Sequence, residues 1–100
     1  MKVYWSALAI RRVSEIADYI SNDRPLSALR WAEGVFKVVR QLERFPARGR
    51  IVPEVQRPSI RELIHGEYRV IYKIQSDSVG ILTARHGRRR LDRSELRTNR

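Results

Sequence analysis

The sequence contains no cysteine, only two histidines, and few residues that interrupt regular structure, with 5 glycines and 4 prolines among 100 residues. Without cysteine there is no disulfide framework, no thiolate nucleophile and no thiolate metal ligand. Two histidines twenty-one positions apart, His65 and His86, make a poor zinc set. A P-loop, a glycine-rich dinucleotide fingerprint and an HExxH motif are missing as well. The sequence therefore predicts neither a metal site nor a cofactor.

Long apolar runs are also missing. No stretch approaches the roughly 18 residues of a membrane span, and the first six residues lack the apolar stretch of a signal peptide. The hydrophobic content of 42% is nevertheless enough for a compact core, and 100 residues suffice for one domain. We therefore expect one soluble domain in the cytoplasm, without a membrane partner.

Acidic residues are scarce compared with basic ones, since 11 Asp and Glu face 21 Lys and Arg for a net charge of +10. All but three of the basic residues are arginine, which forms bidentate contacts with phosphate and carboxylate groups. Residues 88–100 alone carry six cations against two anions. The charge indicates a polyanionic partner, either nucleic acid or an acidic protein, although an arginine-rich proteome is an alternative explanation.

The hydrophobic periodicity predicts two helices early in the chain. Ser6 can cap a first helix, and the turn-forming sequence from Ser21 to Pro25 separates it from a second helix that ends before Pro46. The apolar stripes consist of Ile10, Val13, Ala17 and Ile20 in the first helix and Ala28, Trp31, Ala32, Val35, Val39 and Leu42 in the second. The short connection favours an antiparallel helical hairpin.

Extended segments lie on both sides of the helices. Residues 3–5 can form a short strand, residues 46–58 an exposed basic loop, and residues 60–64, 68–74 and 79–86 a three-stranded antiparallel meander. The fold class is thus α+β: an N-terminal strand, an antiparallel helical hairpin and the meander. One face of the middle strand should pack on the helices, while the other presents Arg69 and Lys73 to solvent or a ligand.

The chain divides into a single domain at residues 1–90 and a basic C-terminal tail at residues 91–100. We expect the tail to be a frayed helix or disordered until bound. The four large aromatic residues Trp5, Trp31, Phe36 and Phe45 are assigned to core packing rather than to base stacking.

The strongest candidate for chemistry is the group formed by Arg69, Arg85 and His86. Cleavage of RNA by its own 2′-hydroxyl needs a proton acceptor near neutral pH and cations for the phosphorane charge. Alternatively, the arginines bind a partner's carboxylates and His86 is a strand-end residue without a catalytic role. His65 is expected to be an exposed turn residue, and Arg61 and Glu62 are expected to form a cross-strand ion pair.

Six segments, in order, resemble the RelE/ParE superfamily of toxins from bacterial type II toxin–antitoxin modules. They are Val3-Tyr4-Trp5-Ser6, Ala28-Leu29-Arg30-Trp31, the segment from Leu42 to Arg50, Arg61-Glu62-Leu63, the segment from Tyr68 to Tyr72, and Arg85-His86-Gly87-Arg88-Arg89. The resemblance implies a growth-arresting toxin, of the kind that stabilises plasmids. Its partner would be a cognate antitoxin with an acidic C-terminal segment and a DNA-binding N-terminal domain, together in a hetero-oligomer.

The superfamily divides by target. RelE-like members cut mRNA on the ribosome, whereas ParE-like members poison DNA gyrase and are not enzymes. Arg69, Arg85 and His86 fall near functional positions of the RelE-like branch, but the 46–58 loop has no lysine and Gly87 stands where that branch often has a tyrosine. The resemblance therefore favours a gyrase inhibitor, with a ribosome-dependent endoribonuclease as the alternative. In the ParE-like case the residues contacting the target or antitoxin would be Arg61, Arg69, Lys73, Arg85, Arg88, Arg89 and Arg90.

Overall fold

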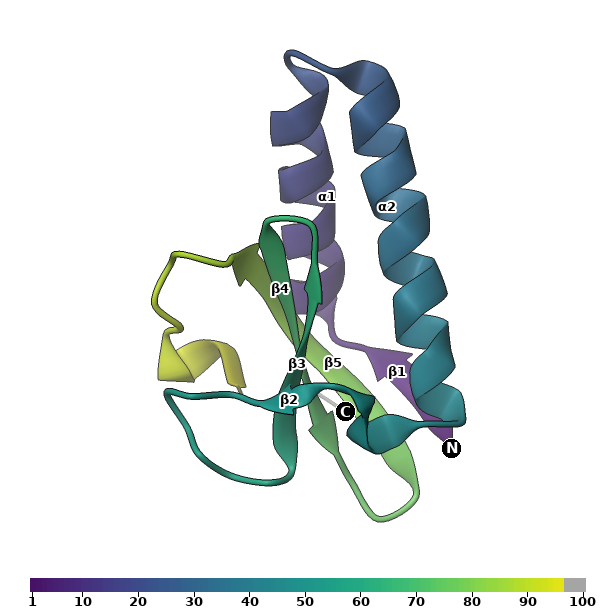
Figure 1. Ribbon diagram of the computed structural model, residues 1–100, viewed down its shortest axis with the longest axis vertical. Helices are drawn as coiled ribbons and strands as arrows, with labels where there is room; N and C mark the ends of the chain where they lie inside the picture. The colour runs from purple at the N-terminus through teal and green to yellow at the C-terminus, as the bar shows by residue number, and fades with distance from the viewer. Residues whose placement is uncertain (97–100) are drawn as a thin grey trace.

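The computed structural model describes residues 1–96 and consists of a helical hairpin on a five-stranded sheet (Figure 1). Its helices and strands are β1 (Lys2–Trp5), α1 (Ala7–Ser21), α2 (Pro25–Arg40), β2 (Arg50–Ile51), β3 (Ile60–His65), β4 (Tyr68–Ile74) and β5 (Ser78–His86), with 3₁₀ helices η1 (Gln41–Glu43), η2 (Pro46–Arg48) and η3 (Arg93–Leu96). None of the described helices is both long and apolar enough to cross a membrane.

The strands follow the order β1-β5-β4-β3-β2, in which β1 runs parallel to β5 and the other neighbours are antiparallel. The predicted α+β fold and the meander of β3, β4 and β5 are confirmed. The two-residue strand β2 lies inside the segment predicted to be a loop, where Arg50 and Ile51 pair with Glu62 and Arg61. Such a short strand carries no alternation that a sequence pattern could detect.

Residues at the ends of the two helices determine where each helix begins and ends. Ser6 caps α1 as predicted, since its side chain accepts a hydrogen bond from the backbone N–H of Ala9 at 2.9 Å. Pro25 starts α2, where its missing N–H costs nothing. The α-helix ends at Arg40, earlier than predicted, because the chain tightens into η1 before Pro46, which disfavours a helical conformation at Phe45.

The main core lies between the hairpin and the helical face of the sheet. Its buried members include Ala9, Val13, Ile20, Ala28, Trp31, Val35, Val39, Leu42, Tyr68, Val70, Tyr72, Val79 and Ile81. Ile10, Phe36 and Phe45 were expected in this core but are more than half exposed. Ile10 and Phe36 are one residue beyond the positions that face the sheet, since a helix turns by about 100° per residue. Phe45 follows η1 in the loop.

A second, smaller core covers the opposite face of the sheet, which we call the outer face. Val52, Ile60, Ile71, Leu82 and Leu91 are buried there, and Leu96 packs against them. The described part of the predicted tail is therefore neither frayed nor detached, because Leu91 and Glu95 are 7% and 6% exposed. Residues 97–100 of that predicted tail lie outside the described residues.

Candidate functional site

Arg69 on β4 is the centre of a buried ion-pair network on the outer face. Its side chain is 5% exposed and binds two carboxylates, with Nε donating to Glu62 at 2.6 Å and both terminal nitrogens donating to Glu54 at 2.8 Å. Arg50 donates to the second oxygen of Glu62 at 2.6 Å. The expectation that Arg69 faces solvent or a ligand is wrong, because these carboxylates and the segment after β5 cover it.

The network also holds the segment after β5 in place. Arg69 donates to the carbonyl oxygen of Arg89, and the backbone N–H of Leu91 donates to Glu54. The pKa of Glu54 is lowered to about 2, chiefly by the hydrogen bonds from Arg69 and with a further contribution from Leu91. Glu54 is therefore a permanent anion at neutral pH, and it neutralises Arg69.

Arg85 on β5 occupies a second network built around Glu95 of η3. Glu95 accepts hydrogen bonds from Arg85 and from the hydroxyl of Thr83, and it lies 3.5 Å from Arg12 of α1. Burial raises the pKa of Glu95, but the hydrogen bonds from Arg85 and Thr83 outweigh it, so the net pKa is lowered. This charged anchor fixes η3 to the outer face.

The strand register separates the predicted catalytic residues. Arg69 is paired with Arg85, and Tyr68 with His86. Because neighbouring residues of a strand point to opposite faces, the two arginines share the outer face while His86 lies on the helical side. There its ring is edge-on to Tyr68, with centroids 5.4 Å apart. Arg69 is therefore separated from His86 by the sheet, whereas Arg85 and His86, at the end of β5, both line one pocket.

His86 is held at the rim of the helical side. Its Nδ1 accepts a hydrogen bond from the backbone N–H of Arg88 at 3.1 Å, and its Nε2 lies 4.0 Å from a carboxylate oxygen of Glu67. His65 is not an exposed turn residue as expected, since it is only partly accessible and lies against Gly34 of α2. A Cβ at Gly34 would stand 2.5 Å from Nε2 of His65, so the glycine makes room for the imidazole.

The remaining predicted contact residues are spread over several surfaces. The expected cross-strand ion pairing is found at Glu62, which binds Arg69 of β4 and Arg50 of β2. Arg61 instead donates to the carbonyl oxygens of Pro58 and Gly49 at 2.9 Å each. Lys73 lies near the far end of β4 and is partly exposed. Arg88, Arg89 and Arg90 are exposed in the turn after β5.

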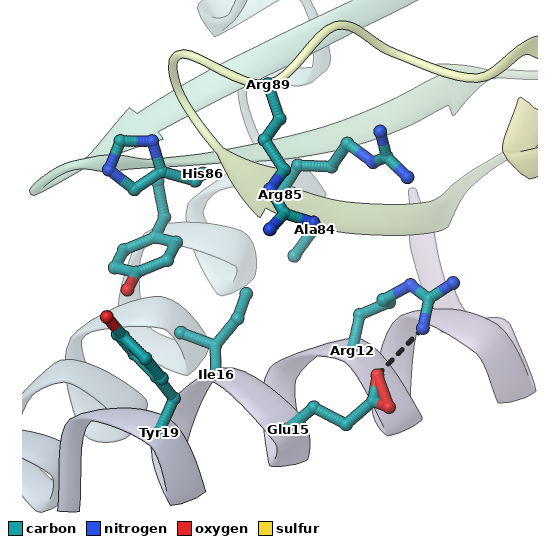
Figure 2. A pocket seen from close by; sticks show the side chains of 9 residues that line it. Arg12, Glu15, Ile16, Tyr19, Ala84, Arg85, His86 and Arg89 are labelled. Carbon is teal, nitrogen blue, oxygen red and sulfur yellow. Dashed lines mark hydrogen bonds and ion pairs between the residues drawn. The ribbon is translucent and has the colours of Figure 1, made fainter.

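A pocket of about 510 Å³ lies between α1 and the C-terminal end of β5. The strand β1 ends at Trp5 opposite Ile81, so within residues 1–96 the remainder of β5 has no strand neighbour on this side. Figure 2 shows residues of α1 along one side of the pocket and Arg85, His86 and Arg89 along the other. The pocket is lined by Arg12, Glu15, Ile16, Tyr19, Tyr68, Ala84, Arg85, His86 and Arg89.

Three carboxylates organise these sites, and of these only Glu62 was expected to form an ion pair, while Glu54 and Glu95 were not anticipated. Glu62 is 1% exposed and Glu95 is 6% exposed, values that are unusual for glutamate and require a cationic partner. The sequence contained one sign of the burial of Glu62. On its strand Glu62 shares one face with Ile60 and Ile64, while Leu63 points to the other face. Glu54 lies in a loop and Glu95 in the four-residue 3₁₀ helix η3, and neither segment is long enough for a periodicity that indicates burial.

Comparison with known proteins agrees with this architecture. Residues 3–91 match the family described as "ParE toxin of type II toxin-antitoxin system, parDE". A curated protein of Sinorhizobium fredii named "Putative toxin Y4kP" is 36% identical over 87 residues, covering 85% of this chain and 86% of that protein. The structure titled "Chromosomal ParDE TA system from P. aeruginosa" superimposes with a TM-score of 0.72 at 19% identity, over 86% of this chain and 95% of that one. The chain therefore belongs to the ParE toxin family of type II toxin–antitoxin systems.

Proposed function

We propose that the protein is a toxin that inhibits DNA gyrase and is neutralised by a cognate antitoxin in the cytoplasm. Membership of the ParE family supports the toxin role. The gyrase target is favoured over ribosome-dependent mRNA cleavage because the two arginines that could stabilise a phosphorane are already neutralised. Arg69 is bound by Glu54 and Glu62, and Arg85 by Glu95.

The observation that carries this choice is that carboxylates hold both Arg69 and Arg85, and that Arg69 lies on the opposite face of the sheet from His86. General acid–base catalysis requires the proton acceptor within hydrogen-bond reach of the reacting hydroxyl, with the stabilising cations at the same phosphate. His86 is packed on Tyr68 on the helical side, and Arg85, which lines the same pocket, is held by Glu95, whereas Arg69 is covered on the outer face by Glu54 and the segment after β5. A gyrase inhibitor needs no such constellation, because it acts by binding.

The net charge of +10 supports an antitoxin that binds through an acidic segment. Such a segment would fold as it binds, since acidic peptides with few aromatic residues are disordered on their own. We expect the gene for it to lie beside that of the toxin and to encode fewer than about 100 residues, with a basic N-terminal half and an acidic C-terminal half.

The test is a plasmid supercoiling and cleavage assay with purified gyrase, ATP and this protein, with and without the antitoxin. We expect loss of supercoiling and linear DNA covalently trapped on gyrase, both suppressed by the antitoxin. A parallel reaction contains ribosomes and mRNA in place of gyrase and plasmid. Cleaved mRNA together with undisturbed gyrase would overturn the proposal and return His86 to a catalytic role.

A further inference from the structure

We propose that the pocket between α1 and the end of β5 binds one phosphodiester of a single-stranded nucleic acid, with the adjoining base against Tyr19. This goes beyond gyrase inhibition, because it gives the toxin a nucleic-acid site of its own. A pocket of about 510 Å³ falls within the range of small-ligand sites and can admit a nucleotide, but not a duplex.

The pocket has one positive charge in excess. Arg12 pairs with Glu15 at 2.8 Å, and Arg85 pairs with Glu95, so these two guanidinium groups are neutralised within the fold. Arg89 forms no ion pair with any residue of the described chain, 1–96, and Figure 2 shows its side chain reaching from the turn into the pocket. A single uncompensated guanidinium matches the single charge of a phosphodiester.

Neutral hydrogen-bond donors surround this charge. His86 accepts the backbone N–H of Arg88 at Nδ1, so in the neutral imidazole the proton is on Nε2. The exposed carboxylate of Glu67 lies 4.0 Å from Nε2, beyond hydrogen-bond distance, so the proton can be donated to a phosphate oxygen once Glu67 turns toward solvent. Burial and the neighbouring Tyr19 raise the pKa of Tyr68 above its ordinary value of 10, and a tyrosine hydroxyl is protonated at neutral pH at either value. The ring of Tyr68 is fixed between Trp31 and His86, at centroid distances of 5.2 and 5.4 Å.

Tyr19 provides an unoccupied aromatic surface beside the charge. It is 73% exposed and lines the pocket together with the apolar side chains of Ile16 and Ala84. Bases stack on exposed aromatic rings regardless of their sequence, because every base has a flat π surface. An unstacked base can therefore lie on Tyr19 while its phosphate reaches Arg89.

The surroundings favour a polyanion with regularly repeated charges. Arg88 and Arg90 flank Arg89 in the turn and are exposed, so they can meet the neighbouring phosphates of the same strand. Each nucleotide supplies a phosphate for the arginines together with a flat ring for Tyr19, whereas an acidic peptide supplies such a ring only at positions where it has an aromatic residue. The combination of a free guanidinium, a run of exposed arginines and an exposed ring therefore favours nucleic acid.

The test measures binding of a fluorescein-labelled ten-residue oligothymidylate to the full chain by anisotropy, across a range of salt concentrations. Tyr19→Ala should weaken binding about tenfold, while Tyr19→Phe, which keeps the ring, should stay within about twofold. Arg89→Ala should weaken binding and make the slope of log affinity against log salt shallower by about 0.7, the value for one lost single-strand phosphate contact. Arg44→Ala is the matched control, because Arg44 is an exposed arginine outside the pocket.

Three results would overturn the proposal. Arg44→Ala could weaken binding as much as Arg89→Ala, which would make the attraction a diffuse effect of net charge. Tyr19→Ala could bind like the unmodified protein, which would remove the stacked base. A ten-residue oligoglutamate could displace the oligonucleotide at equal concentration and itself depend on Tyr19, which would assign the pocket to an acidic peptide. The assay contains no gyrase, so its outcome is independent of the supercoiling assay.

Discussion

At the scale of single residues, Arg69 shows why a basic residue in a family motif need not contact a target. It is 4% exposed and anchors Glu62, whose side chain is fully buried. Removing one partner of a buried ion pair leaves an uncompensated charge, which costs about 3–5 kcal/mol. Arg69→Ala should therefore lower the free energy of unfolding by about this amount, measured by urea denaturation.

Lys73→Ala is the control for this substitution, since Lys73 is on the same strand and the same face but is partly exposed. It should change the free energy of unfolding by less than about 0.5 kcal/mol. If Arg69→Ala were as stable as Lys73→Ala while toxicity disappeared, Arg69 would be a contact residue and the structural role assigned to it would be wrong.

The lowered pKa of Glu54 predicts how the free energy of unfolding depends on pH. Its pKa is about 2 in the folded protein against an ordinary value of 4.5, mainly because Arg69 binds the ionised form. A lowered folded-state pKa contributes stability that is complete above pH 4.5 and is lost as the pH falls toward 2. The urea midpoint should thus be constant from pH 7 to about 5 and then decrease. In Glu54→Gln the midpoint at pH 7 should already be lower and the decrease below pH 5 shallower; parallel curves would exclude Glu54 as the titrating group.

At the scale of elements, the segment after β5 behaves as part of the domain. Leu91 is 7% exposed and packs with Val52, Ile71 and Leu82 on the outer face. Leu91→Ala should lower the free energy of unfolding by about 2–3 kcal/mol, because a buried leucine loses its contacts and leaves a cavity. Leu29→Ala, at a position of α2 that is 56% exposed, should cost much less. Equal effects of the two substitutions would mean that the segment does not pack as described.

The first turn of α1 depends on Ser6 in two ways. Its hydroxyl oxygen accepts the backbone N–H of Ala9, and the same hydroxyl donates to the carbonyl oxygen of Leu82 at 3.0 Å. Ser6→Ala should therefore destabilise the protein by about 1–2 kcal/mol in thermal or urea unfolding. Ser14→Ala, at an exposed position of the same helix, should be neutral or slightly stabilising because alanine is the better helix former. A neutral Ser6→Ala would exclude the cap as a significant contributor.

The elements also show what a sequence can reveal. Apolar repeats at helical spacing identified both helices, and β-branched and aromatic runs identified three strands, because those patterns reflect burial on one face. The same patterns could not reveal that Glu54 and Glu95 fold back onto Arg69 and Arg85, since each contact joins an irregular segment to a strand. The sequence placed Arg69 and Arg85 side by side correctly, but not the division of His86 from them, although strand alternation contained that information.

At the scale of the whole molecule, both faces of the sheet are covered, one by the hairpin and the other by the segments around Val52 and Leu91 (Figure 1). The surface left for partners is therefore the edges, the exposed side of the hairpin and the turn after β5. This arrangement favours a protein that acts by binding, because its outer-face cations are used to hold its own chain together.

Deletion of residues 91–100 distinguishes two possibilities: that the segment after β5 is part of the folded domain, and that it is a tail whose loss leaves the fold unchanged. It removes Leu91 and Glu95, and with them the apolar cover of Ile71 and Leu82 and the anion that neutralises Arg85. The truncated protein should have a lower urea midpoint and should bind a hydrophobic dye, because the outer-face core is opened to water. The double substitution Leu91→Ala and Glu95→Ala in the full-length chain should reproduce most of that loss. If the truncated protein kept the urea midpoint of the full chain and lost only affinity for the antitoxin, these residues would serve binding rather than the fold.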